Sequence, residues 1–359
     1  MSTNVTPEAP PMSPRRGYKR LPTWARTLLA LVTTGVGIAL LVLVLGGNPF
    51  DVFKAIINGS LGNSFNIGQT VTVTAILILT GLAAAIPFSA RLWNIGGEGQ
   101  MTAGAIVAAT LGLIIPAGFP HLLFAPLVVI CAMAGGAAWA FIPGFLKARF
   151  DASEVVTSLM LNFVALFVAI WVISDVFPEG FVQRTRTIAD NATLPRLLEG
   201  SLVDVGVFLA LGAAVAGWVL MAHTRLGFTI RAMGANARAA KLAGIRTNKT
   251  TILTFLVAGL FAGLAGGLIV LGRDHSLLQN FSANFGFIGI AVALVARLKP
   301  LWIIPSAAVF AILRVGSSSL QAAAGLTPSV GEIIVALFVT LLMVTGVITF
   351  LYPESPDAH

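Results

Sequence analysis

Long apolar runs recur along almost the whole of this chain. Each holds around 20 residues, enough for a helix to cross the ~30 Å hydrocarbon core of a bilayer. Short polar or basic segments separate the runs, so the pattern predicts a polytopic, all-α membrane protein. About ten transmembrane helices are expected, near residues 24–46, 66–88, 95–116, 121–145, 155–175, 203–222, 251–272, 286–298, 301–320 and 331–351.

The composition of the 359-residue chain favours a membrane protein over a soluble one. Hydrophobic residues make up 57% and charged residues 10%, and the mean hydropathy is +0.93, far from the averages of soluble domains. The single cysteine, Cys131, excludes an intrachain disulfide. The four histidines lie in separate segments without the i, i+4 spacing of helical metal sites, so no metal site is expected.

Membrane topology accounts for the net charge of +8, because the basic residues lie in short loops between apolar runs rather than on a soluble face. With the N-terminus in the cytoplasm, sixteen of the 22 basic residues fall in cytoplasmic segments, five in external segments and Arg314 within a span. This bias follows the positive-inside rule and predicts that both termini are cytoplasmic. Residues 1–23 are expected to form a disordered tail, residues 24–351 the transmembrane domain and residues 352–359 a second cytoplasmic tail.

Two loops are longer than a minimal turn. The external segment 176–204 mixes charges of both signs with two prolines, and a small extracytoplasmic element is expected there. The cytoplasmic segment 223–250 carries six basic residues and no acidic one, and its pattern predicts one short helix that ends near Gly244. One side of this helix is formed by Ile230, Met233 and Ala237.

The segment from Leu92 to Met101 departs from the pattern of a membrane helix. Three glycines in four residues disfavour helix by ~1 kcal/mol each relative to Ala, and Asn94, Glu98 and Gln100 bring polar groups next to hydrocarbon. Such a segment is stable where protein or a water-lined cavity satisfies its polar groups. An ordinary loop and helix start, with Asn94 as the N-cap and Glu98 in the first turn, is the alternative.

A second segment in the C-terminal half is similar to this one. Asn94–Leu111 and Asn284–Leu298 are both rich in glycine, each follows an apolar span, and they are predicted to cross the membrane in opposite directions. Inverted repeats with Gly-interrupted helices mark binding sites in many transporters. The pair therefore indicates a possible inverted repeat, with chance similarity as the alternative.

Three segments, in a fixed order, resemble a known family. They are NIGGEGQ from Asn94 to Gln100, the cytoplasmic segment Gly227–Ile245 that contains IRAMGAN, and GFIGIAVA from Gly286 to Ala293. Together they resemble permeases of the branched-chain amino acid and simple-sugar ABC importer superfamily, most of all the nucleoside and simple-sugar permeases. Gly325–Ser329 fits the same pattern, and the resemblance spans roughly residues 66–351.

The resemblance implies that the chain is the membrane subunit of an ATP-driven importer. The coupling helix that docks on a separate ATPase would include Gly227, Arg231, Gly234, Asn236, Arg238 and Gly244. The translocation path would include Asn94, Glu98, Gln100, Asn284, Phe285 and Phe287. The implied partners are the ATPase, a second permease that is identical or paralogous, and an extracytoplasmic solute-binding protein, at a bacterial cytoplasmic membrane.

The implied solutes are nucleosides or related sugar-bearing molecules, with ribose or another simple sugar as the alternative. Amide groups suit an uncharged polyhydroxylated solute, because buried donors and acceptors replace water around hydroxyls. An aromatic ring such as Phe285 suits a base or a sugar. The chain has no GxxxxGK[ST] phosphate loop, so the partner is expected to use the ATP, and neither a catalytic residue nor a bound cofactor is expected in this chain.

Two other classes of protein stay open at this point. An ion-coupled secondary transporter needs no ATPase and places ionisable groups in its spans, of which this chain has few. An intramembrane enzyme needs paired acids, histidines or a Ser/His arrangement at the membrane face, and the sequence has no such constellation.

Three features are not explained by the family pattern. Gly97 stands where the family commonly carries a larger apolar residue, and the loop Arg297–Pro300 is unusually basic. Both weaken any inference about the particular solute. Arg314 lies within a predicted span, where it is expected to contact the solute, pair with Glu332 or Asp175, or extend toward the membrane interface.

Overall fold

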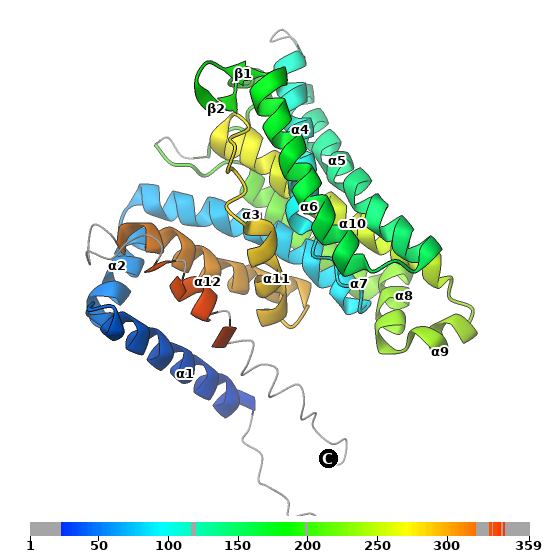
Figure 1. Cartoon of the computed structure of the whole chain (residues 1–359), viewed down its shortest axis with the longest axis horizontal. Coiled ribbons are helices and arrows are strands. Elements are labelled where there is room, and N and C mark those ends of the chain that lie inside the picture. The colour runs from blue at the N-terminus through cyan, green and yellow to red at the C-terminus, as the bar shows by residue number, and fades with distance from the viewer. Residues whose placement is uncertain are drawn as a thin grey trace, which may run out of the picture.

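The computed structural model describes residues 23–115, 120–197 and 200–320, together with residues 330, 331, 333–338, 340 and 341. These residues form helices and one short hairpin (Figure 1). The helices are α1 (Thr23–Val44), α2 (Pro49–Leu61), α3 (Ser64–Ser89), α4 (Gly97–Ile114), α5 (His121–Phe150), α6 (Glu154–Trp171), α7 (Gly206–His223), α8 (Arg225–Ala235), α9 (Ala237–Leu242), α10 (Thr247–Leu268), α11 (Phe285–Val295) and α12 (Ile303–Gly316). Shorter helical turns are η1 (Val172–Val176), η2 (Asp190–Ala192), η3 (Ile269–Asp274), η4 (Pro300–Trp302) and η5 (Ser317–Ser319). Strands β1 (Pro178–Glu179) and β2 (Val182–Thr185) pair antiparallel.

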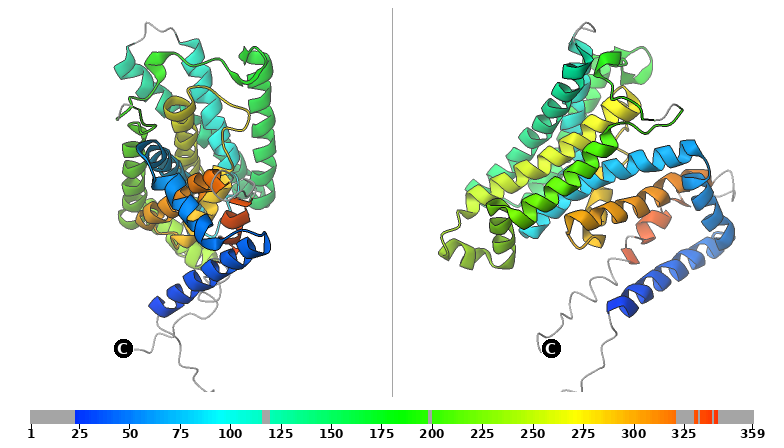
Figure 2. Two further views of the ribbon diagram at one scale, coloured as in Figure 1. Left: turned by 90° about the vertical axis from the view of Figure 1, so that its left-hand side faces the viewer. Right: turned by 180° about the vertical axis from the view of Figure 1, so that it is seen from behind.

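Helix α3 is the centre of the bundle. It packs against α7, α10, α11 and α12, and in Figure 2 it lies between the green and yellow helices and the orange ones. Asn63 caps its start, where the Asn63 Oδ1 accepts the N–H of Asn66 at 2.8 Å. The side chains of α3 are apolar on every face of the helix, and 89% of its most apolar stretch is buried. This is expected of a helix enclosed by other helices.

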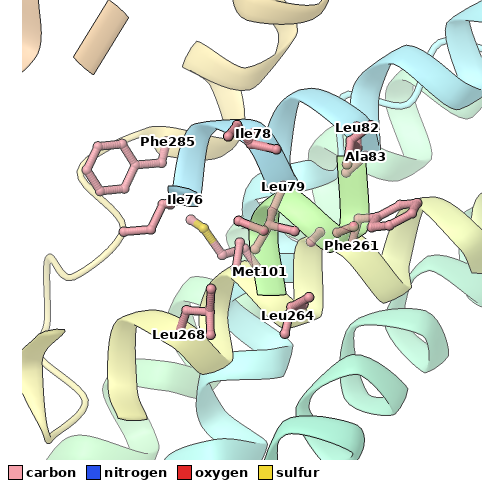
Figure 3. Packing of buried hydrophobic residues seen from close by; sticks show 14 of the residues in the cluster. Ile76, Ile78, Leu79, Leu82, Ala83, Met101, Phe261, Leu264, Leu268 and Phe285 are labelled. Carbon is pink, nitrogen blue, oxygen red and sulfur yellow. The ribbon is translucent and has the colours of Figure 1, made fainter. Parts of the chain in front are cut away.

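One buried apolar cluster joins α3 to α4, α10 and α11. Figure 3 shows side chains of all four helices gathered in it, among them Ile76, Leu79, Met101, Leu264 and Phe285. Lipid tails are as apolar as these side chains, so close packing rather than the hydrophobic effect holds such helices together in a membrane. The cluster therefore provides a fixed frame for the segments that begin α4 and α11.

Small residues bring α5 and α10 into close contact. A Cβ added to Gly136 of α5 would lie 2.6 Å from the Cα of Gly263 in α10, and one added to Gly263 would lie 3.0 Å from the Cα of Gly136. Membrane helices associate closely where small residues allow their backbones to approach. These two glycines are therefore required by the α5–α10 packing.

Six helices within the described residues are long and apolar enough to cross a membrane, or seven if α1 and α2, which meet at 110°, count as one span. They are α3, α5, α6 with η1, α7, α10 with η3, and α12 with its flanking turns. The prediction of a polytopic, all-α membrane protein is confirmed.

The predicted count of about ten spans is not confirmed. Helix α4 begins with a polar segment, and α11 has 11 residues, which extend only roughly 17 Å. The last predicted span, 331–351, and both predicted tails lie wholly or largely outside the described residues. Helix α2 was not predicted, although Asn48 caps it and Pro49 begins it, which are both helix-start signals.

Candidate functional site

An irregular segment, residues 90–96, joins α3 to α4 and is held by one face of α6. This face carries Glu154, Ser158 and Asn162, which lie in a row because they are four residues apart. The three side chains accept hydrogen bonds, in turn, from the main-chain N–H groups of Trp93, Ile95 and Gly99. Sequence reasoning missed this row, although three polar residues at helical spacing in an apolar span are a detectable signal.

Asn162 makes two of these hydrogen bonds. Its Oδ1 accepts the N–H of Gly99 at 2.9 Å, and its Nδ2 donates to the carbonyl of Ile95 at 3.0 Å. A Cβ added to Gly99 would lie 3.0 Å from the Cα of Asn162, so the contact favours glycine. Irregular backbone inside a membrane protein needs its polar groups satisfied, and α6 thereby fixes the place where α4 begins.

Asn94 and Gln100 bond to each other. The Nδ2 of Asn94 donates to the Oε1 of Gln100 at 3.1 Å, and the Nε2 of Gln100 donates to the Oδ1 of Asn94 at 2.9 Å. Both residues are only 1% exposed, so in this conformation their amides are buried and stabilise the irregular segment 90–96 through hydrogen bonds within the protein. The alternative of Asn94 as an N-cap is wrong, because α4 begins at Gly97 and Gly96 occupies the cap position.

Glu98, in the first turn of α4, reaches the start of α11. Its Oε2 accepts the N–H of Gly286 at 2.8 Å, and it is also hydrogen-bonded to the side chain of Ser282 and the backbone of Phe287. Asn284, at the cap position of α11, makes no side-chain cap bond. Because the first N–H groups of a helix lack partners within it, the Glu98 carboxylate caps α11 from another helix.

The contact between α4 and α11 requires a glycine at position 286. A Cβ added to Gly286 would lie 2.6 Å from the Cα of Glu98, and a backbone atom cannot move aside cheaply. A Cβ added to Gly97, on the other side of the contact, would meet only Gly286, at 3.6 Å from its carbonyl oxygen. The two glycines face each other, but only Gly286 is sterically required.

Helices α4 and α11 run in opposite directions from this contact. Near the far end of α4, the carbonyl of Gly112 accepts the N–H of Ala189, which follows the hairpin. The far end of α11 leads to Pro300, which lies near Gly217 in the C-terminal half of α7. The N-terminal ends of two helices thus meet inside the bundle, an arrangement that forms the solute site in many transporters.

The candidate residues around α11 differ in exposure. Asn284 is exposed and has a left-handed φ of 63°, and Phe287 is 38% exposed. Phe285 is buried, with the guanidinium carbon of Arg273 5.7 Å from the centre of its ring. Of the six predicted path residues, Glu98, Asn284 and Phe287 keep accessible surface, and the other three are buried.

The segment predicted to form one short helix before Gly244 forms two, α8 and α9. The Oγ1 of Thr224 caps α8 by accepting the N–H of Gly227 at 3.1 Å, and the Oδ1 of Asn236 caps α9 by accepting the N–H of Ala239 at 3.0 Å. The prediction of one continuous helix is wrong because Asn236 adopts an extended backbone, with φ −159° and ψ 105°.

The break at Asn236 also separates the predicted apolar side. Ile230 and Met233 of α8 are both buried, but Ala237, predicted to share their side, begins α9 and is exposed. A helix N-cap residue has non-helical backbone angles, so the row of apolar positions ends there.

Glycines hold α8 against the bundle. A Cβ added to Gly227 would lie 2.6 Å from the carbonyl oxygen of Met221 in α7, and one added to Gly234 would collide with the carbonyl oxygen of Ser89 in α3. Gly244 has open space around it, but its φ of +84° is left-handed, the conformation of a glycine that ends a helix.

The outward side of α8 and α9 combines positive charge with apolar side chains. Arg231, Asn236 and Arg238 are exposed, and Phe228 and Leu242 are 60% and 85% exposed. A hollow of about 350 Å³ lies beside them, bounded by the ends of α3, α5 and α10. Exposed apolar residues next to arginines are common at surfaces that bind other proteins.

Arg314 lies in the last turn of α12 and is partly buried. Its predicted partner Glu332 and the motif Gly325–Ser329 lie outside the described residues, so the role of Arg314 stays a prediction. Among the residues that the structure describes, no group of three or more His, Cys, Asp or Glu side chains is placed to hold a metal ion.

Comparison with known proteins identifies the family. The family model described as branched-chain amino acid transport system / permease component matches residues 66–348. This range contains the α4–α11 contact and both α8 and α9. The chain belongs to this family. It is a multi-pass membrane permease.

Individual relatives cover nearly the whole permease. The nucleoside ABC transporter permease protein NupB of Lactococcus lactis is 33% identical, over 91% of this chain and 93% of its own length. The guanosine ABC transporter permease protein NupP of Bacillus subtilis is 32% identical, over 92% and 96%. The glucose ABC transporter permease protein TsgB13 of Haloferax volcanii is 33% identical, over 92% and 90%.

Proposed function

We propose that this permease is the membrane subunit of an ATP-driven importer for nucleosides or related sugar-bearing solutes. The observation that carries the proposal is its similarity to NupB and NupP over more than nine-tenths of the chain, at 33% and 32% identity. A simple sugar is the second candidate solute, because the similarity to the glucose permease TsgB13 has the same identity of 33%.

The solute path follows the contact between α4 and α11. Glu98, Asn284 and Phe287 offer a carboxylate, an amide and an aromatic ring, which are the groups that recognise hydroxyls and flat bases. The start of α4, which carries Glu98, is held in place by the buried pair Asn94 and Gln100 and by α6. Alternating access then requires α4 and α11 to separate, with the hydrogen bond between Glu98 and Gly286 as the contact that breaks.

The outward side of α8 and α9 is the docking surface for the ATPase. Phe228 and Leu242 suit an apolar groove, and Arg231 and Arg238 suit acidic or carbonyl groups on its rim. Movement of α8 reaches α3 at Gly234, where the two backbones are in contact. From the end of α3, the irregular segment 90–96 leads to Glu98.

The importer also needs a second permease, identical or paralogous, and an extracytoplasmic solute-binding protein. The distribution of basic residues supports an orientation with both termini, α8 and α9 in the cytoplasm and the hairpin outside. The absence of a phosphate-binding loop from the sequence supports ATP use by the separate subunit. The location that follows is a bacterial plasma membrane.

Uptake by proteoliposomes tests the proposed solute. The vesicles hold the permease with its ATPase, and the binding protein is added outside. Labelled guanosine is expected to accumulate only with ATP in the lumen, and excess adenosine, but not glucose, is expected to compete. Competition by glucose alone favours the sugar candidate, whereas uptake without the ATPase under an ion gradient contradicts the proposal.

Charge reversal tests the docking surface. The double variant R231E/R238E is expected to lower the amount of ATPase that co-purifies with the permease by about 10-fold or more, since it replaces attraction by repulsion. Lys249→Glu is the matched control, because Lys249 is exposed in the same basic segment but lies on α10. Equal loss in both variants, or loss in neither, contradicts the assignment.

A further inference from the structure

The hairpin of β1 and β2 carries the most exposed large apolar side chain of the described residues. Phe181, at its tip, is 109% exposed, and Val182 is 57% exposed. The neighbouring Gly180 has a φ of +55°, and no atom lies within 4 Å of its Cβ position. An ion pair between Arg184 and Glu179 joins the two strands. The tip of the hairpin therefore projects away from the helices, and the ion pair holds its two strands together (Figure 1).

The hairpin follows a span long enough to carry it past the hydrocarbon. Helix α6 and η1 form an apolar span of 23 residues, Glu154–Val176, which extends roughly 35 Å against a hydrocarbon core of ~30 Å. The charged and polar residues Glu179, Gln183 and Arg186 lie within five positions of Phe181 along the chain. A single aromatic among such groups is typical of a protein interface, whereas membrane interfaces use belts of several Trp and Tyr side chains.

The second strand of the hairpin is bonded to the segment that leads into α11. The N–H of Thr185 donates to the carbonyl of Leu277, and the N–H of Leu277 donates to the Oγ1 of Thr185, both at 3.0 Å. The N–H of Gln279 donates to the carbonyl of Gln183 at 3.0 Å. Thr185 and Leu277 are fully buried, so no water competes for these bonds and the two segments move as one.

This segment continues directly to the α4–α11 contact. The carbonyl of Phe281 accepts a bond from the Nη2 of Arg273 at 3.0 Å, and the next residue, Ser282, is hydrogen-bonded to Glu98. Helix α11 begins three residues later, at Phe285. A continuous bonded path therefore runs from the hairpin tip to Glu98.

We infer that Phe181 anchors the solute-loaded binding protein on the permease, and that β2 transmits this docking to α11 through residues 277–282. The inference rests on the proposed function, which supplies the binding protein and places the hairpin outside. The partner presents an apolar pocket for the Phe181 ring, with polar groups around it that complement Glu179, Arg184 and Arg186.

Binding measurements on the permease–ATPase complex in nanodiscs test the anchor. Phe181→Ala is expected to weaken binding of the nucleoside-saturated binding protein by about 10- to 100-fold, the loss typical of a buried aromatic anchor. Phe53→Ala is the control, since Phe53 is 63% exposed but lies on α2. Unchanged affinity in Phe181→Ala overturns the inference. Failure of the unsubstituted permease to bind any solute-binding protein contradicts the proposed function instead.

Lipid contact is distinguished with a dye at the tip. The variant Cys131→Ala/Val182→Cys keeps Phe181 and carries an environment-sensitive fluorophore at a single, exposed thiol beside it. Its emission is expected to shift to the blue only when the binding protein is added. A blue-shifted emission in nanodiscs alone, unaffected by the binding protein, means that the tip lies in the headgroup region and overturns the inference.

The transmission step is tested with Thr185→Val, which keeps the shape of the side chain but removes the acceptor for Leu277. Binding of the partner and basal ATPase activity are expected to stay within about 2-fold of the unsubstituted complex, while stimulation of the ATPase by the binding protein falls several-fold. Val182→Thr, on the exposed part of the same strand, is the control. Full stimulation in Thr185→Val refutes the path through β2.

Discussion

The contact between α4 and α11 allows a sharp test, because it pairs two glycines with opposite steric requirements. In Gly286→Ala the new Cβ would lie 2.6 Å from the Cα of Glu98, nearly 1 Å closer than ordinary contact. Helix α11 must then shift away from α4, which weakens the hydrogen bond between Glu98 and Gly286. Overpacking of this kind costs ~1–3 kcal/mol, and we expect the apparent Tm to fall by about 5 °C.

Gly97→Ala is the matched control for this substitution. Its Cβ meets only ordinary contacts, at 3.6 Å, and Ala favours helix over Gly by up to ~1 kcal/mol. We expect its Tm to stay the same or rise slightly. Thermal unfolding in detergent, followed by size-exclusion chromatography, measures both variants. An unchanged Tm in Gly286→Ala, or an equal fall in both variants, would refute the steric argument.

Two other predictions concern stability. Asn162→Leu leaves the N–H of Gly99 and the carbonyl of Ile95 without the partner that Asn162 provides, which costs ~1–3 kcal/mol of stability for each buried group. We expect a lower Tm than in the control Met160→Leu, whose site is 51% exposed. Equal Tm values in the two variants contradict the role of α6. Burial raises the pKa of Asp204, which lies just before α7, to about 6, although the N–H of Gly206 and the charge of Arg196 oppose the rise. The folded state therefore binds a proton at Asp204 more tightly than the unfolded state does. This proton stabilises the folded state fully below the unfolded pKa of Asp204, and the stabilisation is lost as the pH rises through about 6. Tm values at pH 5 and pH 8 are expected to differ less in Asp204→Asn, and an unchanged difference excludes this group as the cause.

Local sequence patterns predicted the long helices better than the contacts between them. The apolar runs of α3, α5 and α7 are long enough to indicate helices in any context. The glycines and polar residues from Asn94 to Gln100 identified a segment that is not an ordinary span. Its partners on α6 are more than 50 positions away along the chain, and nothing in the local pattern shows which helix face will satisfy an irregular backbone.

The errors have physical causes of the same kind. Sequence reasoning treated the segment before Gly244 as one helix because its apolar spacing is helical, but Asn236 caps a new helix there. It counted the segment 286–298 as a full span, although α11 has 11 residues and starts inside the bundle. Glu98 lies in the first turn of α4 as predicted, but local sequence could not show that its carboxylate caps α11 across a tertiary contact.

The most direct test of the account is a reversible cross-link between α4 and α11. In the background Cys131→Ala, the pair Glu98→Cys/Ser282→Cys places one thiol on α4 and one three residues before α11, at positions whose native side chains are hydrogen-bonded. Because cysteine is shorter than the glutamate it replaces, a short bis-methanethiosulfonate reagent joins the two thiols. Cross-linking is expected to stop ATP-driven uptake relative to the untreated form of the same variant, and dithiothreitol is expected to restore it, because transport requires α4 and α11 to separate. Undiminished uptake by fully cross-linked permease would contradict this account of the transport path.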